Sequence, residues 1–221
     1  MQPPQVIQRV FPSRLRKGVR DMVKAALPKQ LASGVCRVSP RLMDEEYTCG
    51  RWEYLNDLEE MARYAVIAGY CRHIGDISSV LDLGCGIGLL RAWLRPVEVI
   101  DYVGVDFSTV AIEMARIRWT DESTKFIATD IATFVPDRKF DVIVLNEVLY
   151  YFERPDWILR RVAAFLKENG RLVISLWDSP ESRRAWLRSR SSVHILDEVQ
   201  VRHRSGLSWE IRLCRPRLVA T

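Results

Sequence analysis

The sequence predicts an α/β fold with a doubly wound, Rossmann-like and mostly parallel sheet. Short apolar runs alternate with segments of helical spacing between residues 78 and 177, an order typical of a parallel sheet with helices on both faces. The glycine-rich stretch "LGCGIG" stands between the first apolar run and the helical segment after it. Two extended runs around Ser205 and Gly206 predict a C-terminal antiparallel hairpin, and a helical segment ahead of residue 78 predicts an N-terminal helical cap.

The N-terminal part predicts a basic arm followed by this cap. Residues 1–45 form the arm: up to Pro40 they contain eight basic residues against one acidic residue, and five prolines that keep any helix short. Residues 46–75 form the cap, in which an apolar stripe predicts a helix over 54–73. We expect the cap and all that follows, residues 46–221, to form one domain.

The core of this domain, residues 78–177, contains the alternating elements. We predict its strands at 80–83, 101–106, 125–128, 141–145 and 171–176. We predict its helices at 89–94, 109–119 and 156–167, the last of them stopped by Asn169 and Gly170. Residues 178–217 add a C-terminal helix and the hairpin.

Composition limits the class of protein. The 221 residues are 48% hydrophobic, and because no run of about eighteen apolar residues occurs we expect no transmembrane segment. The five cysteines show no Cys-x-x-Cys spacing, so we expect reduced thiols, no metal site and a cytoplasmic protein. The net charge of +5 is concentrated at the two ends, with nine arginines between 183 and 217. Such ends suit nucleic acid, an anionic membrane surface touched by the arm, or solvent alone.

Three glycines at alternate positions, Gly84, Gly86 and Gly88, follow the first predicted strand. Glycine weakens strands and helices, so three of them here need another reason. A strand, a tight glycine turn and a helix start bring bare backbone and the positive end of a helix dipole against a bound molecule. The dinucleotide fingerprint fails because its last position is Leu89, and no Walker lysine follows.

Two aspartates stand in register with the glycine loop. Asp106 ends the second strand, where Rossmann-type sheets place the carboxylate that accepts ribose hydroxyls. Asp130 follows the third strand, where a carboxylate can accept from an adenine amino group while Ile131 packs on the ring. Each aspartate alone is equally compatible with a helix cap or a turn. Together with the glycines they predict a nucleotide at the carboxyl edge of the sheet.

The successive stretches "VLDLGCGIG", "YVGVDFS", "FIATDIATF", "FDVIVLNEVLYYF" and "LKENGRLVIS" resemble the motifs of class I S-adenosylmethionine-dependent methyltransferases, over about residues 80 to 176. The resemblance implies S-adenosyl-L-methionine as the cofactor and S-adenosyl-L-homocysteine as the product. It places the methionine part on the glycine loop, the ribose on Asp106 and the adenine on Asp130 and Ile131. Asp82 would order the loop or face the ammonium group. The same motifs add three more cofactor-binding positions: Cys85, which we interpret as a small loop filler, Phe107 and Asn146.

The stretch "LNEVLYYFERPD" after the fourth strand contains our candidate catalytic residues, Glu147 and Tyr151. Many small-molecule methyltransferases of this family carry Glu-His where this chain has Tyr150-Tyr151, which argues against a histidine base here. Glu147 would accept a hydrogen bond from an acceptor hydroxyl or ammonium, and Tyr151 would face the methyl group. Both are also compatible with a packing role beside Val148.

An aromatic loop ahead of the core, with Tyr47, Trp52 and Tyr54, predicts a lid over the cofactor. Arg63 is our candidate for the cofactor carboxylate, and Tyr64 for the methyl pocket. The alternative is that Trp52 and Tyr54 only anchor the start of the cap helix.

The stretches "EVLYY" and "GRLVIS" and the short basic tail resemble the rhizobial nodulation-factor N-methyltransferases. That resemblance implies a small-molecule acceptor, a sugar or other polar metabolite, methylated at nitrogen or oxygen. A monomer and a homodimer both fit the sequence. Two other functions stay open: an RNA or protein methyltransferase that uses the basic ends, and a non-catalytic module that keeps the fold. The chain lacks the Asp/Asn-Pro-Pro-Tyr/Phe motif of adenine N-methylation, since Glu147 follows Asn146, so nucleic acid is not favoured.

Overall fold

The computed structural model describes residues 38–75, 77–95, 101–119 and 121–217. The chain divides into two units, residues 1–30 and 31–221, and all the described residues belong to the second. Most of the predicted basic arm lies outside the described residues. No helix in these four stretches is long and apolar enough to cross a membrane.

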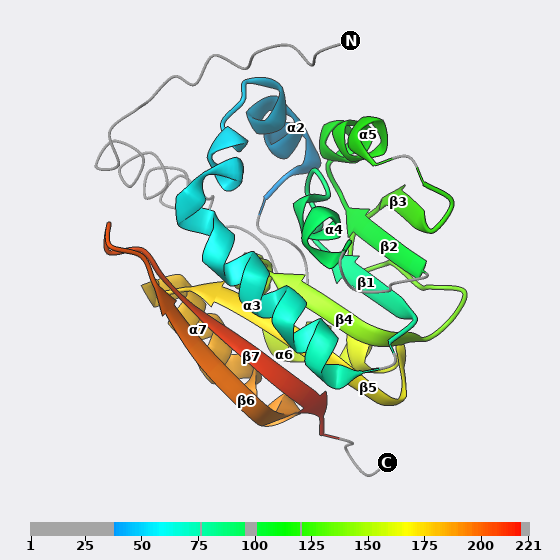
Figure 1. Cartoon of the computed structure of the whole chain (residues 1–221), viewed down its shortest axis with the longest axis vertical. Coiled ribbons are helices and arrows are strands. Elements are labelled where there is room, and N and C mark those ends of the chain that lie inside the picture. Colours follow the sequence, from blue (N-terminus) through cyan, green and yellow to red (C-terminus); the bar gives the residue numbers. More distant parts are fainter. Residues whose placement is uncertain (1–37, 76, 96–100, 120, 218–221) are drawn as a thin grey trace. The chain divides into compact units, whose positions relative to one another are not determined.

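A seven-stranded sheet in the order β3-β2-β1-β4-β5-β7-β6 forms the centre of the domain. Strands β1 to β5 run parallel, and β7 pairs antiparallel with both β5 and β6. This confirms the predicted Rossmann-like fold with its C-terminal hairpin (Figure 1). The strands are β1 (Ser79–Leu83), β2 (Asp101–Asp106), β3 (Thr124–Ala128), β4 (Phe140–Asn146), β5 (Leu166–Trp177), β6 (Val193–Arg202) and β7 (Ser208–Pro216).

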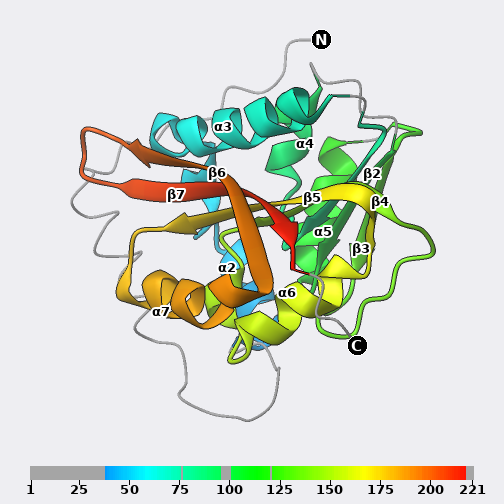
Figure 2. The same cartoon turned by 90° about the horizontal axis from the view of Figure 1, so that it is seen from below.

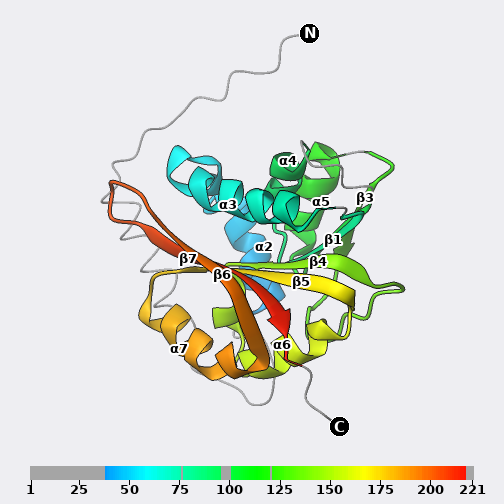
Figure 3. The same ribbon diagram turned by 60° about the horizontal axis from the view of Figure 1, so that its bottom comes forward.

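Helices cover both faces of the sheet, as Figures 2 and 3 show. One face carries α3 (Leu58–Ile74), α4 (Leu89–Leu94) and α5 (Thr109–Arg118). The other face carries α6 (Pro155–Ala163) and α7 (Pro180–Ser189). Because both faces are covered, the interior strands are apolar on both sides rather than alternating with polar residues.

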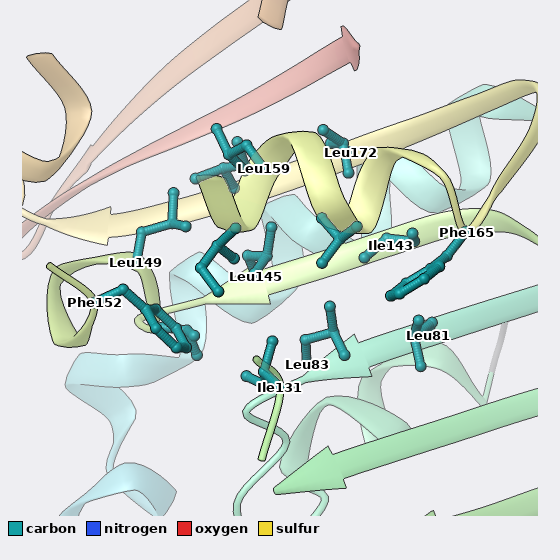
Figure 4. Close-up of a cluster of buried hydrophobic side chains, with 14 of the residues drawn as sticks. Leu81, Leu83, Ile131, Ile143, Leu145, Leu149, Phe152, Leu159, Phe165 and Leu172 are labelled. Atoms are coloured by element: carbon teal, nitrogen blue, oxygen red, sulfur yellow. The ribbon is translucent and has the colours of Figure 1, made fainter. Parts of the chain in front are cut away.

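Strand β4 shows how one strand serves two cores. Ile143 and Leu145 belong to the hydrophobic cluster under α6 (Figure 4), whereas Val142 and Val144 belong to the cluster under α3 to α5. Successive side chains of a strand point to opposite faces, and all four residues are fully buried. The residues of the run "DVIVL" from Val142 to Leu145 therefore pack against helices on both faces of the sheet.

Two predicted helices differ in extent from the observed ones. The cap helix predicted over 54–73 starts at Leu58 as α3, and a short 3₁₀ helix, η1 (Glu53–Asn56), precedes it. The helix predicted over 156–167 ends at Ala163, and β5 starts at Leu166 instead of 171. Sheet pairing decides the second difference, because Leu166 pairs with Phe140 at the start of β4. Asn169 and Gly170 therefore lie inside a strand and stop no helix.

A helix that we did not predict, α2 (Pro40–Thr48), crosses the boundary drawn between arm and cap. Its start carries a recognisable signal: the Ser39 side chain accepts from Leu42 N at 3.2 Å, and Pro40 occupies the first turn. The predicted aromatic loop is thus partly helical, since Tyr47 belongs to α2.

Candidate functional site

The glycine loop leaves the carboxyl end of β1, between β2 on one side and β4 on the other. The order in which strands are added across the sheet reverses at this point, from β1–β2–β3 on one side to β4–β5 on the other, and open α/β sheets bind ligands there. Gly84, Gly86 and Gly88 have φ angles of +79°, +52° and +73°, which favour glycine. A β-carbon added to Gly86 would lie 2.7 Å from the hydroxyl oxygen of Tyr47, and one added to Gly84 would collide with Val148.

Asp106 holds this loop from the end of β2. Its Oδ2 accepts from Gly86 N at 2.9 Å and its Oδ1 accepts from Ser108 N at 2.9 Å. Burial raises the pKa of Asp106 to about 6, although the backbone N–H groups of Ser108, Gly86 and Phe107 act to lower it. Each carboxylate oxygen can accept a second hydrogen bond, so the group can also meet a pair of ligand hydroxyls. The neighbouring Phe107 is half-buried.

Asp82 is buried at the end of β1, and its Oδ2 accepts a hydrogen bond from the Tyr102 hydroxyl at 2.6 Å. Burial raises the pKa of Asp82 to about 7, against the lowering effect of the Tyr102 bond. Among the described residues, no donor reaches Asp82 Oδ1 or Asn146 Oδ1, and both atoms are buried. Two buried acceptors without a donor at one edge of the sheet suit a positively charged ligand group.

Cys85 fills space inside the loop. Its Sγ lies 2.9 Å from the position of a β-carbon on Gly104 and donates to Gly86 O at 3.6 Å. Burial, with the charges of Asp106 and Asp82, holds the pKa of the Cys85 thiol well above its ordinary value. A buried neutral thiol is a poor nucleophile.

Asp130 begins the turn after β3. Its Oδ1 accepts from Ala132 N at 2.8 Å, and Thr129 N donates to Asp106 O at 2.8 Å, so the turn follows directly beside β2. Ile131 is buried in the cluster that contains Leu83 (Figure 4). The contact of Asp130 and Ile131 with an adenine stays a prediction.

Tyr47, Trp52 and Tyr54 form an aromatic cluster ahead of α3. The rings of Tyr47 and Trp52 stack at 5.8 Å with an interplanar angle of 29°, and Tyr54 lies 6.0 Å from Trp52. The buried Trp52 Nε1 has no partner among the described residues. Burial and then the charge of Asp106 hold the pKa of Tyr47 well above its ordinary value.

Arg63 is buried in α3, with 2% of its surface exposed. Its guanidinium lies 3.2 Å from Glu60 Oε2, donates to the Tyr64 hydroxyl at 3.0 Å and lies over the ring of Trp209 at 5.8 Å. Sequence reasoning missed Glu60 and Trp209 as its neighbours, although Glu60 stands one helical turn away. Arg63 Nε has no partner among the described residues.

Glu147 directly follows β4 in a strained conformation. Its φ of +62° is the one positive value among the non-glycine residues that the structure describes. Glu147 N donates to Ser175 O at 2.9 Å, and its Oε2 accepts from the Tyr150 hydroxyl at 3.2 Å. The half-buried Tyr151 lies beside Tyr150, with ring centroids 4.7 Å apart. Backbone strain of this kind clusters at functional sites.

The described residues contain no group of three or more His, Cys, Asp or Glu side chains that could hold a metal ion. Cys49, Cys71, Cys85 and Cys214 are free thiols.

With this geometry in place, comparison with known proteins decides the family. The family model for a methyltransferase domain matches residues 13–212. The chain belongs to the class I S-adenosylmethionine-dependent methyltransferases.

Curated relatives of this methyltransferase match it over part of their length. It is 36% identical over 104 residues to nodulation protein S of Bradyrhizobium diazoefficiens, covering 45% of this chain and 48% of that one. It is 33% identical over 111 residues to trans-aconitate 2-methyltransferase of Enterobacter sp. (strain 638), covering 48% and 42%. The chain spans about half the length of the curated relatives it matches.

Solved structures share the fold of the methyltransferase. The N-methyltransferase NodS of Bradyrhizobium japonicum WM9, in complex with S-adenosyl-L-homocysteine, superposes with a TM-score of 0.68 at 21% identity, covering 81% of this chain and 99% of that one. The 1,6-didemethyltoxoflavin-N1-methyltransferase of Burkholderia thailandensis gives a TM-score of 0.65 at 18% identity, covering 96% and 93%.

The site of the methyltransferase fits the family's cofactor. Asp82 Oδ1 and Asn146 Oδ1 offer buried acceptor capacity for an ammonium group. Asp106 retains acceptor capacity for hydroxyls, and Gly86 lacks the side chain that would separate its backbone from a ligand.

Proposed function

We propose that this chain transfers the methyl group of S-adenosylmethionine to a nitrogen or oxygen of a small polar acceptor such as a sugar or an amine-bearing metabolite. The strained Glu147 carries the proposal: it places a carboxylate after β4, next to the tyrosines that follow it. The names of two relatives support a small-molecule acceptor, since one is a trans-aconitate 2-methyltransferase and the other a 1,6-didemethyltoxoflavin-N1-methyltransferase.

The cofactor supplies an electrophilic methyl group on a sulfonium. The chain has to align the acceptor lone pair with that methyl group and keep water away. In our proposal Asp82 and Asn146 receive the cofactor ammonium, Arg63 the carboxylate and Asp106 the ribose hydroxyls. The aromatic cluster of Tyr47, Trp52 and Tyr54 excludes water from the cofactor site.

Glu147 then binds the acceptor. Its carboxylate accepts a hydrogen bond from an acceptor amine or hydroxyl, and Tyr150 orients it through the 3.2 Å bond. Tyr151 shapes the wall of the methyl pocket. An amine that arrives deprotonated needs no strong base, whereas a sugar hydroxyl needs one nearby.

Three of the nine C-terminal arginines form ion pairs with carboxylates. Arg183 and Arg184 pair with Asp178 and Glu181, and the buried Arg212 pairs with Glu198 and Glu210. Paired arginines release few counterions, so these three would add little to RNA binding, and a steep loss of RNA affinity with salt would favour an RNA acceptor over a small molecule.

A screen of amines, amino sugars and polar metabolites with a labelled methyl donor tests the proposal. With the acceptor found, Glu147→Gln should raise KM for an amine, because the carboxylate accepts a hydrogen bond from the N–H of the neutral amine. Tyr151→Phe should lose at most about tenfold in rate for an amine, and about a hundredfold if Tyr151 hands on a proton from a hydroxyl. Glu153→Gln, a carboxylate six residues further on, is the matched control. Unchanged kinetics in both Glu147→Gln and Tyr151→Phe would remove these residues from the site.

A further inference from the structure

The helix α2 buries two apolar side chains, Met43 and Tyr47, and is otherwise attached to the domain through polar groups. Neither hydrophobic cluster of the described domain contains a residue of α2 or η1. The element that α2 contacts most is α5, and Figure 1 shows the two helices side by side. Segments with few buried apolar contacts open at low free-energy cost.

One carboxylate makes the attachment. Asp44 Oδ1 accepts from the Ser108 hydroxyl at 2.5 Å and from Val110 N at 3.2 Å, and its Oδ2 accepts from the Thr109 hydroxyl at 3.0 Å. Burial alone would raise the pKa of Asp44, but the bonds from Ser108, Val110 and Thr109 lower it below its ordinary value. A charged carboxylate at the first turn of α5 is also favoured by the helix dipole.

These bonds connect α2 to the cofactor loop. Ser108 caps α5 by accepting from Ala111 N at 3.1 Å, and its own N–H donates to Asp106, which holds Gly86. One turn after Asp44, the buried Tyr47 reaches over Gly86 and stacks on Trp52. The bonds of Asp44 therefore act together with the burial and stacking of Tyr47 to hold its ring over the loop.

We propose that residues 40–56, here called the cover, open and close over the glycine loop and that Asp44 is the positioning residue that holds the cover shut. The bonds of Asp44 to the start of α5 break when the cover opens, and the cofactor enters or the product leaves past Tyr47. The inference rests on the proposed function, because it takes the loop beneath the cover to be the cofactor site.

Hydrogen exchange of the whole chain without cofactor tests the cover directly. Asp44→Ala should raise exchange within residues 40–56 at least about fivefold and leave the peptide of α6 unchanged. Glu45→Ala is the matched control, since it removes the same charge from an exposed neighbouring residue whose side chain pairs with Arg41 on the same helix. Asp44→Ala exchanging like Glu45→Ala, or a rise throughout the domain, would overturn the proposal.

Release of S-adenosyl-L-homocysteine gives a second readout. Asp44→Ala should speed dissociation about tenfold, or about 1.4 kcal/mol, with a nearly unchanged association rate. Thr109→Val removes one of the three donors without touching the Ser108 cap and should give a smaller effect, and Asp44→Asn should recover part of the loss. Equal dissociation rates in Asp44→Ala and Glu45→Ala would count against the cover. If the unmodified chain binds no S-adenosyl-L-homocysteine, the proposed function fails, while the exchange experiment still decides whether Asp44 holds residues 40–56.

Discussion

Asp82 and Asp106 are buried carboxylates beside the glycine loop, whereas Asp44 and Asp141 are partly exposed carboxylates that several donors surround. Burial raises the pKa of the first two, to about 7 and about 6. Hydrogen bonds lower the pKa of the other two, against the opposing effect of burial. One residue type thus serves two purposes: the first pair is available to a cationic or hydroxyl-bearing ligand, and the second pair holds elements together.

The raised pKa of Asp82 predicts a pH-dependent stability for the cofactor-free chain. An unfolded aspartate has a pKa of about 3.9, so the folded chain binds this proton more tightly. The resulting stabilisation is complete below about pH 4 and is lost as pH rises toward 7. The side chain that Asp82→Asn introduces stays neutral at both pH values. Between pH 5 and pH 7.5, the unfolding free energy of this variant should therefore rise by about 1–3 kcal/mol relative to that of the unmodified chain. Denaturant unfolding at both pH values measures this, and a constant difference would contradict it.

A single carbon atom added at Gly86 tests the role of the glycine loop. Gly86→Ala adds a β-carbon at a φ of +52° and within 2.7 Å of the Tyr47 hydroxyl oxygen. We expect cofactor affinity to fall by at least about tenfold, because the close approach of backbone, Tyr47 and ligand is lost. Gly69→Ala is the control, since a β-carbon in the middle of α3 meets nothing within 4 Å. Calorimetry with S-adenosyl-L-homocysteine distinguishes them, and equal affinities would make the loop merely structural.

At the scale of elements, Asp141 joins the starts of three strands. Its Oδ2 accepts from Ser78 N and Ser79 N, both at 3.0 Å, from the hydroxyls of both serines, and from Lys167 at 2.9 Å. These donors precede or begin β1 and lie near the start of β5, while Asp141 lies in β4. The bonds hold the pKa of Asp141 at about 2, although burial opposes this.

Replacing this carboxylate should loosen the amino ends of the central strands. Asp141→Ala leaves backbone and side-chain donors without an acceptor, and we expect a loss of about 2–4 kcal/mol in unfolding free energy. The folded pKa lies below the unfolded one, so the contribution is present above about pH 4 and disappears as pH falls toward 2. Asp137→Ala, an exposed aspartate four residues earlier, provides the control in denaturant titrations. A loss as small as that of the control would refute the role of Asp141.

At the scale of the whole molecule, parallel strands bring distant residues to one edge. Asp82, Asp106 and Asn146 lie at the carboxyl ends of β1, β2 and β4, and the glycine loop leaves the same edge. The layers of helices on both faces close off the sides of the sheet (Figure 3). The candidate site therefore lies at this edge, and Tyr47 of α2 lies over its glycine loop.

The division of the chain into two units predicts a tolerated truncation. Every residue that we assign to the site or to its cover lies in the unit that begins at residue 31. Deleting residues 1–30 should keep the affinity for S-adenosyl-L-homocysteine within about threefold, whereas deleting 1–56 also removes the cover and should cost at least about tenfold. Calorimetry on both truncations compares them. A collapse of affinity on removing residues 1–30 alone would show that the first unit contributes to the site.

The sequence by itself determined the sheet, its helical layers and the position of the glycine loop. Most predicted strand ends lie within one residue of those observed, because buried apolar runs and glycines act over short distances along the chain. The same local reasoning placed Asp82, Asp106 and Glu147 at strand ends. It failed where pairing across the sheet competed with local preference, as at Leu166, which the pattern assigned to a helix.

The tertiary structure decided how the site residues meet. No pattern near Asp44 in the sequence predicts its hydrogen bond with Ser108, 64 residues away. The sequence also does not predict that Tyr102 on β2 donates to Asp82 on β1. The pairing of Arg63 with Trp209 likewise needs α3 folded over the hairpin. Hydrogen bonds and burial depend on distance in space, and the pKa of a carboxylate follows from its enclosure, which no spacing along the chain encodes. Residue types at strand ends can thus be predicted from sequence, whereas their hydrogen-bond partners and charge states depend on the folded structure.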